Sequence, residues 1–160
     1  MIYSKTCEYA IRSLIYFADH PEKDSATVKT VSRETKVPQA YVAKIFQCLA
    51  RRRILSSRRG PNGGYALLIA PAKLSLIKII HALDDLSQSS FSRCVMGLQK
   101  CNDRNPCPLH PIWVKAKEEM LERLGSSTIS DVAVLGDKFK IGRQRRFLLS
   151  KHMRNIFSVR

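Results

Sequence analysis

Long apolar runs are missing from this 160-residue sequence, and no stretch approaches the ~18 consecutive apolar residues of a membrane-spanning helix. Near the start of the chain, Lys5, Glu8 and Arg12 interrupt the continuous apolar core that a secretory signal requires. We therefore expect a cytoplasmic protein without a membrane span. Because 44% of the residues are hydrophobic, the chain can still bury an ordinary core, and we expect one or two small globular domains.

Acidic residues are also scarce, since 13 Asp and Glu stand against 28 Lys and Arg, for a formal net charge of +15. Residues 1–70 carry 12 basic against 5 acidic residues, residues 71–136 carry 8 against 7, and residues 137–160 carry 8 against 1. The positive charge is thus concentrated at the two ends of the chain. Such an excess predicts a polyanionic partner, either nucleic acid or an anionic membrane surface.

Cysteine is infrequent, and the C-x2-C pairs that usually mark a zinc site are absent. Five cysteines in a reducing compartment are not expected to form a disulfide framework. Three of them, Cys94, Cys101 and Cys107, form C-x6-C-x5-C in a stretch that contains proline and lacks a clear periodicity. Thiolates that converge from irregular backbone are typical of iron–sulfur clusters, so these three are candidate ligands. Cys7 and Cys48 lie in helical patterns and are interpreted as small buried hydrophobes.

Apolar residues at helical spacing predict three helices before residue 54. The first covers 4–19, with Ser4 or Thr6 as N-cap, and the second covers 27–35. After a turn at 36–37, the third begins with Pro38 in its first helical position and continues to residue 53. Its broad apolar face consists of Tyr41, Val42, Ile45, Phe46 and Leu49. A short turn between the last two helices indicates a helix-turn-helix.

Two β-prone segments, 54–57 and 65–69, flank a run rich in glycine, proline and asparagine, which predicts a hairpin. A hairpin directly after a helix-turn-helix is a wing, so the expected fold is mainly α with a small β-hairpin wing. Further helices are predicted from residue 74 and over 112–125, with a last turn capped by Thr128. Between them, residues 87–111 are expected to form a loop.

Candidate DNA contacts gather on the third helix and at the hairpin tip. A recognition helix in the major groove needs polar or basic residues on its outer face, and a wing needs cations and a backbone that can approach DNA closely. The predicted contacts are Gln39, Tyr41, Lys44, Gln47, Arg51, Arg58, Arg59, Gly60 and Gly63. A solvated basic surface would carry the same charge, but the order of turn, helix and basic hairpin favours DNA binding.

The segment SSRRGPNGGYAL, preceded by VPQAYVAKIFQCLARRRIL and followed by LSLIKIIHALDD, resembles the Rrf2 family of bacterial winged-helix regulators. The resemblance covers about residues 1–134. It implies a homodimer joined by a long dimerisation helix over 112–125, a near-palindromic operator in double-stranded DNA, and insertion of Arg59 into the minor groove. It also implies an iron–sulfur cluster, 2Fe–2S or 4Fe–4S, on the three loop cysteines. The expected domains are a winged helix-turn-helix over 1–72, a cluster-binding and dimerisation region over 73–134, and a basic tail over 135–160.

Two residues compete for the fourth position on such a cluster. His110 follows Cys107 by three residues, and some members of the family use a histidine there. Glu8 matches an acidic residue that in other members binds the cluster of the opposite subunit. Water, a small thiol or no fourth ligand are the further alternatives, and both residues could also be ordinary surface groups. A labile non-cysteine ligand would suit a sensor, because an exposed iron can react with nitric oxide or oxygen.

Residues and resemblance together predict a transcriptional regulator, a repressor, whose operator affinity depends on a cluster that senses redox state, nitric oxide or iron–sulfur status. The alternative is a winged-helix regulator with a structural zinc or no metal that is signalled by a protein partner. An enzyme or electron-transfer protein is not predicted, because neither a fourth loop cysteine nor paired acid and base groups are found. Residues 137–160 either form a basic amphipathic helix that binds DNA phosphates, a membrane or an acidic partner, or are a poorly ordered extension.

Overall fold

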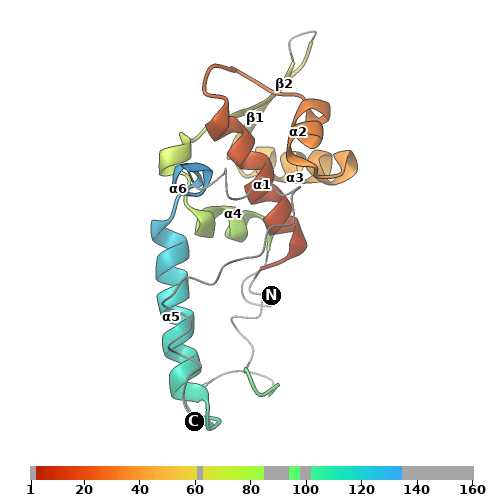
Figure 1. The fold of residues 1–160 in the computed structure, drawn as a ribbon. Coiled ribbons are helices and arrows are strands. Elements are labelled where there is room, and N and C mark those ends of the chain that lie inside the picture. Colours follow the sequence, from red (N-terminus) through yellow and green to blue (C-terminus); the bar gives the residue numbers. More distant parts are fainter. Residues whose placement is uncertain (1–2, 61–62, 85–93, 98–101, 135–160) are drawn as a thin grey trace, which may run out of the picture.

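The computed structural model describes residues 3–60, 63–84, 94–97 and 102–134. A two-stranded antiparallel hairpin stands among helices, which confirms the mainly α fold with a wing (Figure 1). In chain order the elements are α1 (Lys5–Asp19), α2 (Val28–Thr35), α3 (Gln39–Arg51), β1 (Leu55–Arg58), β2 (Gly64–Leu67), the 3-10 helix η1 (Pro71–Lys73), α4 (Leu76–Leu83), α5 (His110–Ser126) and α6 (Ile129–Val134). The tail over 135–160 lies outside the described residues.

Polar side chains cap three of the helices. The hydroxyl of Ser4 accepts a hydrogen bond from the Cys7 N–H at 3.2 Å, and that of Thr27 accepts from the Thr30 N–H at 3.1 Å. Thr128 accepts from the Asp131 N–H at 3.3 Å. Each bond satisfies an N–H of the first turn that has no partner inside the helix. The predicted caps Ser4 and Thr128 are confirmed.

Several helix ends differ from the prediction by one or two residues. Pro38 is the N-cap of α3 rather than its first helical residue, and the helix ends at Arg51 instead of 53. Arg53 adopts a positive φ of 55°, and the next N–H, of Ile54, donates to the Leu49 carbonyl at 2.9 Å. This closes the helix and directs the chain into β1. α5 begins at His110, two residues before the predicted start.

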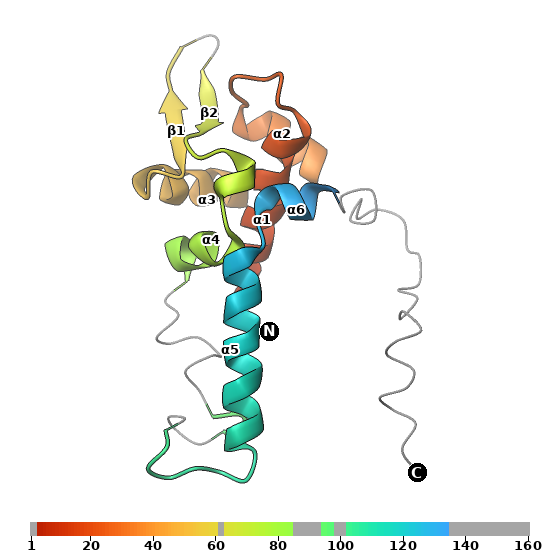
Figure 2. The same ribbon diagram turned by 90° about the vertical axis from the view of Figure 1, so that its left-hand side faces the viewer.

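One hydrophobic core joins the three N-terminal helices, the hairpin, α4 and α6. Leu14, Phe46 and Leu49 are fully buried in it, and so are Ile79 and Ile129 from beyond residue 72. The core therefore extends across the expected domain boundary, and α4 and α6 pack with the winged helix. α5 instead projects away from this core (Figures 1 and 2). No helix in the described part of the chain combines the length and apolarity needed to cross a membrane.

Ala26 forms an isolated antiparallel β-bridge with Tyr65 of β2. Its N–H donates to the Tyr65 carbonyl and its carbonyl accepts from the Tyr65 N–H, both at 2.8 Å. Gly64, beside this bridge, has a φ of +157°, and a Cβ built there would lie 2.6 Å from the Ala26 carbonyl oxygen. The hairpin can approach the segment before α2 this closely because residue 64 has no side chain.

We expect Gly64→Ala to lower the free energy of unfolding by about 2–4 kcal/mol, because the new methyl group would push the bridge apart and strain the backbone. Urea denaturation followed by circular dichroism measures the loss. Gly125→Ala is the matched control, since a Cβ there meets the Ile77 side chain at an ordinary 3.9 Å within a helix. The control should gain about 0.5–1 kcal/mol. Equal denaturation midpoints for Gly64→Ala and the parent would contradict the expectation.

The end of α4 is tied to the start of α1 through Asp84. Its carboxylate accepts from the backbone N–H of Ser4 at 2.8 Å and from the Ser4 hydroxyl at 2.6 Å, across 80 residues of sequence. Because Ser4 is also the N-cap of α1, one carboxylate stabilises both a helix start and the position of α4. Asp84 is the last described residue before the segment that leads to the cysteine loop.

Asp84→Ala is expected to reduce the free energy of unfolding by about 1.5–3 kcal/mol, the usual range for hydrogen bonds to a charged group. Thermal unfolding measures the change. Asp84→Asn keeps an acceptor oxygen and should lose a smaller amount. If the alanine and asparagine variants melt together with the parent protein, the Asp84 contact contributes nothing to stability.

Candidate functional site

The outer face of α3 carries the predicted base and phosphate contacts. Gln39, Lys44, Gln47 and Arg51 are all exposed, and the last three recur every three to four residues and so share one face. The opposite face packs into the core through Val42, Ile45, Phe46 and Leu49. α3 thus presents a polar and basic surface beside the wing.

Tyr41 was predicted both to lie on the apolar face of the third helix and to contact DNA, and the structure contradicts the first of these predictions. The helical pattern placed it on the inward apolar face, and this is wrong, because the residue is 52% exposed. Its ring packs edge-on against Tyr9 of α1, with ring centroids 5.5 Å apart. Lys5 and Arg12 in turn lie over the Tyr9 ring, 5.3 and 5.7 Å from its centroid. Tyr41 is therefore held by α1 while remaining at the protein surface.

The tip of the wing carries Arg58 and Arg59, both exposed. The turn closes through a hydrogen bond of 2.9 Å from the Gly63 N–H to the Gly60 carbonyl, and Gly60 has a φ of +110°. A Cβ on Gly63 would lie 2.6 Å from the Arg58 carbonyl oxygen, so this close turn also depends on glycine. The hairpin extends beyond the helices (Figure 2), which leaves both guanidinium groups accessible to a large ligand.

The cysteine loop has two thiols in contact. The Sγ atoms of Cys94 and Cys107 are 3.5 Å apart, and the residues are 7% and 8% exposed. Every other described residue of 94–97 and 102–109 is exposed. Cys101, the third predicted ligand, lies outside the described residues. The two described cysteines are thus turned inward in a loop that buries little else.

His110 lies at the start of α5 beside the cysteine loop and is 7% exposed. Its N–H donates to the Cys107 carbonyl at 2.9 Å, and its Nε2 is 2.8 Å from Oδ1 of Asp103. When the ring donates from Nε2 to this carboxylate, its acceptor nitrogen is Nδ1. No local pattern in the sequence signals the Asp103 contact, because it joins a position of an irregular loop to the first residue of α5.

The two thiols fit a shared metal. Thiolates bound to one tetrahedral ion at ~2.3 Å are about 3.8 Å apart, close to the 3.5 Å observed between Cys94 and Cys107. Within the described ranges, however, no group of three or more His, Cys, Asp or Glu side chains is arranged to hold a metal ion. The described part of the loop therefore brings together two thiols that could bind one metal ion, and His110 follows Cys107 by three residues.

Glu8 is not brought to the cysteine loop within one chain. It lies in the first turns of α1, where its carboxylate pairs with Lys5 at 2.8 Å and with Arg12 at 2.9 Å. Figures 1 and 2 show α1 in the winged-helix end of the molecule, away from the loop that leads into α5. A contact between Glu8 and the described loop cysteines, Cys94 and Cys107, would therefore need a second subunit.

The two other cysteines lie on α1 and α3. Cys7 is fully buried, and burial together with a hydrogen bond to Asp84 raises the pKa of its thiol to about 12. Cys48 is half-buried, and its thiol donates to the Ala82 carbonyl at 3.5 Å. The interpretation of Cys7 as a small buried group is confirmed, and both residues lie on winged-helix elements rather than in the loop.

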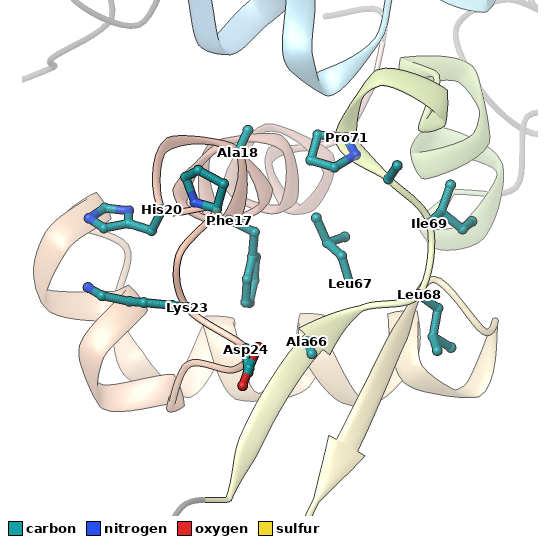
Figure 3. A pocket seen from close by; sticks show the side chains of 12 residues that line it. Phe17, Ala18, His20, Lys23, Asp24, Ala66, Leu67, Leu68, Ile69 and Pro71 are labelled. Carbon is teal, nitrogen blue, oxygen red and sulfur yellow. The ribbon is translucent and has the colours of Figure 1, made fainter.

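A surface cleft of about 280 Å³ lies between the end of α1 and the strand β2. Phe17 and Leu67 point into it, while His20 and Lys23 lie on one side (Figure 3). It shares no lining residue with the predicted DNA contacts or the cysteine loop. The cleft is therefore separate from both candidate sites.

An exposed recognition helix followed by a basic hairpin defines the winged-helix class of transcriptional regulators. The chain belongs to the Rrf2 family, because the model of that family, described as an iron-dependent transcriptional regulator, matches residues 3–134. Members of this family are DNA-binding regulators and not enzymes. The protein is accordingly a transcriptional regulator of the Rrf2 family.

Individual relatives agree with this assignment. A helix-turn-helix regulator of Aquifex aeolicus is 29% identical over 140 residues, covering 86% of this chain and 95% of its own. The regulator IscR of Xenorhabdus nematophila is 25% identical over 124 residues, covering 78% and 74%. Among solved structures, IscR of T. potens has a TM-score of 0.67 at 18% identity and covers 90% of this chain and 94% of its own. CymR, the global cysteine regulator of B. subtilis, has a TM-score of 0.69 at 19% identity and covers 84% and 97%. The structures share the fold.

Proposed function

We propose that this regulator binds its operator as a homodimer and that an iron–sulfur cluster on Cys94, Cys101 and Cys107 controls its affinity for DNA. The observation that carries the proposal is the buried thiol pair, with sulfurs 3.5 Å apart, in a loop whose other described residues from 94 to 109 are exposed. Within the described part of the loop, so small a set of buried groups provides no hydrophobic core that could hold it in place. A bound inorganic centre would supply the missing organisation.

Each part of the loop would have a defined task. The thiolates of Cys94 and Cys107 would hold the cluster from the two ends of the loop, with Cys101 between them. When bound, the cluster supplies iron whose oxidation state and exposed coordination position respond to redox conditions or nitric oxide. Asp103 would orient the His110 ring, as carboxylates commonly do for metal-bound histidines.

The cysteine loop is connected to the DNA-binding surface through α5. The helix begins at His110, at the end of the loop, and α6 follows it and packs into the winged-helix core through Ile129. A change in the loop would therefore bias the position of the wings if two copies join along α5. Ile112, 72% exposed, and Leu121, 36% exposed, are available on α5 for such a contact. A two-fold dimer would present two recognition helices to a near-palindromic operator.

Two variants distinguish between His110 and Glu8 as the fourth ligand of the cluster. His110 is supported by its burial beside Cys107, and Glu8 is supported only through a second subunit. His110→Ala and Glu8→Gln should be compared by the visible spectrum of the loaded protein and by its rate of bleaching with nitric oxide. The variant that shifts the spectrum identifies the ligand, and two unchanged spectra would point to water, a small thiol or no fourth ligand.

The experiment that tests the cluster is purification without oxygen, followed by measurement of iron, acid-labile sulfide and the visible spectrum. Brown protein that bleaches with nitric oxide is the expected result. A colourless protein with one zinc per chain would instead support a structural metal, which the same thiol pair would also suit. A protein with neither metal would leave a winged-helix regulator that is signalled by a partner protein.

A further inference from the structure

We propose that Cys94 and Cys107 form a disulfide in the metal-free protein, and that this disulfide blocks the loop from taking up a metal centre until it is reduced. The two sulfurs are already 3.5 Å apart, and a disulfide requires about 2.05 Å. The formation of the bond therefore needs a small movement of two side chains. The formation of the disulfide is independent of the proposed function, and its role as a block on loading rests on that function.

The fold, rather than chain proximity, selects this pair. Cys94 and Cys107 are 13 residues apart, whereas Cys101 is seven and six residues from its neighbours in the sequence. In an unfolded chain, loop closure would favour the two shorter pairings by roughly two- to threefold each. A dominant link between Cys94 and Cys107 would therefore report the folded loop.

The other two cysteines are poor competitors for oxidation. Cys7 has no exposed surface and a thiol whose pKa is raised to about 12, so little thiolate is present at neutral pH. Cys48 lies on α3 and donates to the Ala82 carbonyl. The loop thiols, in contrast, lie beside exposed residues, since 95–97 after Cys94 and the described residues on both sides of Cys107 are exposed, so a small oxidant can reach them.

The chemistry balances with a hydroperoxide as the oxidant. One thiolate attacks a peroxide oxygen, the O–O bond breaks, and a sulfenic acid and water form once a proton is taken up. The second thiol attacks the sulfenic sulfur, so that the S–S bond forms and the S–O bond breaks with loss of a second water. Two thiols are oxidised by two electrons in total, and hydrogen peroxide is reduced to two molecules of water.

Tryptic mapping tests the pairing directly, because cleavage after Arg93, Lys100, Arg104 and Lys115 places the three loop cysteines in separate peptides. The full-length, metal-free protein is treated with a slight excess of hydrogen peroxide, alkylated and digested without reductant. The expected product is a peptide covering 94–100 linked to one covering 105–115, with Cys101 alkylated. Links to Cys101 as the main product, or sulfinic acids without a link, would overturn the pairing.

Two variants keep the test independent of misfolding. Cys101→Ser should form the same disulfide in the same yield, whereas oxidation of the parent protein in guanidinium chloride should shift the products toward links with Cys101. Cys48→Ser is the matched control and should behave as the parent. A Cys101→Ser protein that remains fully reduced under these conditions would refute the proposal.

The uptake of iron by oxidised and reduced protein tests the block on loading separately from the disulfide. Oxidised protein supplied with iron and sulfide without a thiol reductant should incorporate at least tenfold less iron than reduced protein, and dithiothreitol should restore uptake. Equal iron uptake by both forms would contradict the proposed block on loading, but not the proposed disulfide. A reduced protein that takes up no iron and sulfide would count against the proposed cluster instead, so the two failures are distinguishable.

Discussion

Replacing Cys107 with serine is expected to remove most of the iron and acid-labile sulfide from protein purified without oxygen, together with its visible absorbance. The hydroxyl of serine is a much weaker ligand for iron than a thiolate, and the variant would leave Cys94 without its partner across 3.5 Å. Cys94→Ser should have the same effect. If the cluster controls affinity, the difference in operator affinity between loaded and metal-free protein, typically about 5–150-fold for such coupling, should disappear in both variants.

Cys48→Ser serves as the control for this result. Cys48 is half-buried on α3, and a serine hydroxyl can still donate to the Ala82 carbonyl. This variant should retain the parental iron, sulfide and spectrum. Should both loop variants also keep their iron and sulfide while the protein remains folded, the thiol pair does not hold the cluster.

Removing both wing arginines, in Arg58→Ala/Arg59→Ala, is expected to weaken binding to a short labelled DNA duplex by about tenfold or more at moderate salt. Each contact to a phosphate releases counterions, so loss of two contacts should make the slope of log K against log[salt] less negative by about 1.8. Fluorescence anisotropy over a series of salt concentrations measures both quantities. The measurement does not depend on the operator sequence, because this term arises from the DNA backbone.

Lys78→Ala/Lys115→Ala is a matched control for the loss of charge. Both lysines are exposed, and they lie on α4 and α5, on the side of the core away from the wing (Figure 2). The control lowers the net charge by the same two units. An equal loss of affinity in the two double variants would show that overall charge, rather than contact by the wing, determines DNA binding.

Much of the helical structure follows from short-range patterns. Ser4, Thr128 and the apolar spacing of α3 identify helices correctly, because capping and helical periodicity depend on residues three to four positions apart. Tyr41 shows the limit of such patterns. An aromatic side chain at an apolar position of a helical pattern is normally predicted to be buried. The ring of Tyr41 instead packs on Tyr9 at the surface. Hydropathy does not distinguish these environments.

Arg53 shows a similar limit at the end of α3. A left-handed residue at a helix end is usually glycine, so an arginine gives no signal for the stop. The predicted helix therefore ran two residues too far. The hydrogen bond from Ile54 to Leu49 stabilises the turn in spite of the side chain.

Residue order alone was sufficient to specify the helix-turn-helix, the basic hairpin and a loop with three cysteines, because each is encoded within a few neighbouring positions. The folded chain decided which distant groups meet: Ser4 with Asp84, Ala26 with Tyr65, and Cys94 with Cys107. These pairings depend on how α1, α4 and the hairpin pack around one core, and that packing is a property of all the buried side chains together. For the same reason, the core that extends past residue 72 could not be anticipated from the local composition on either side of it.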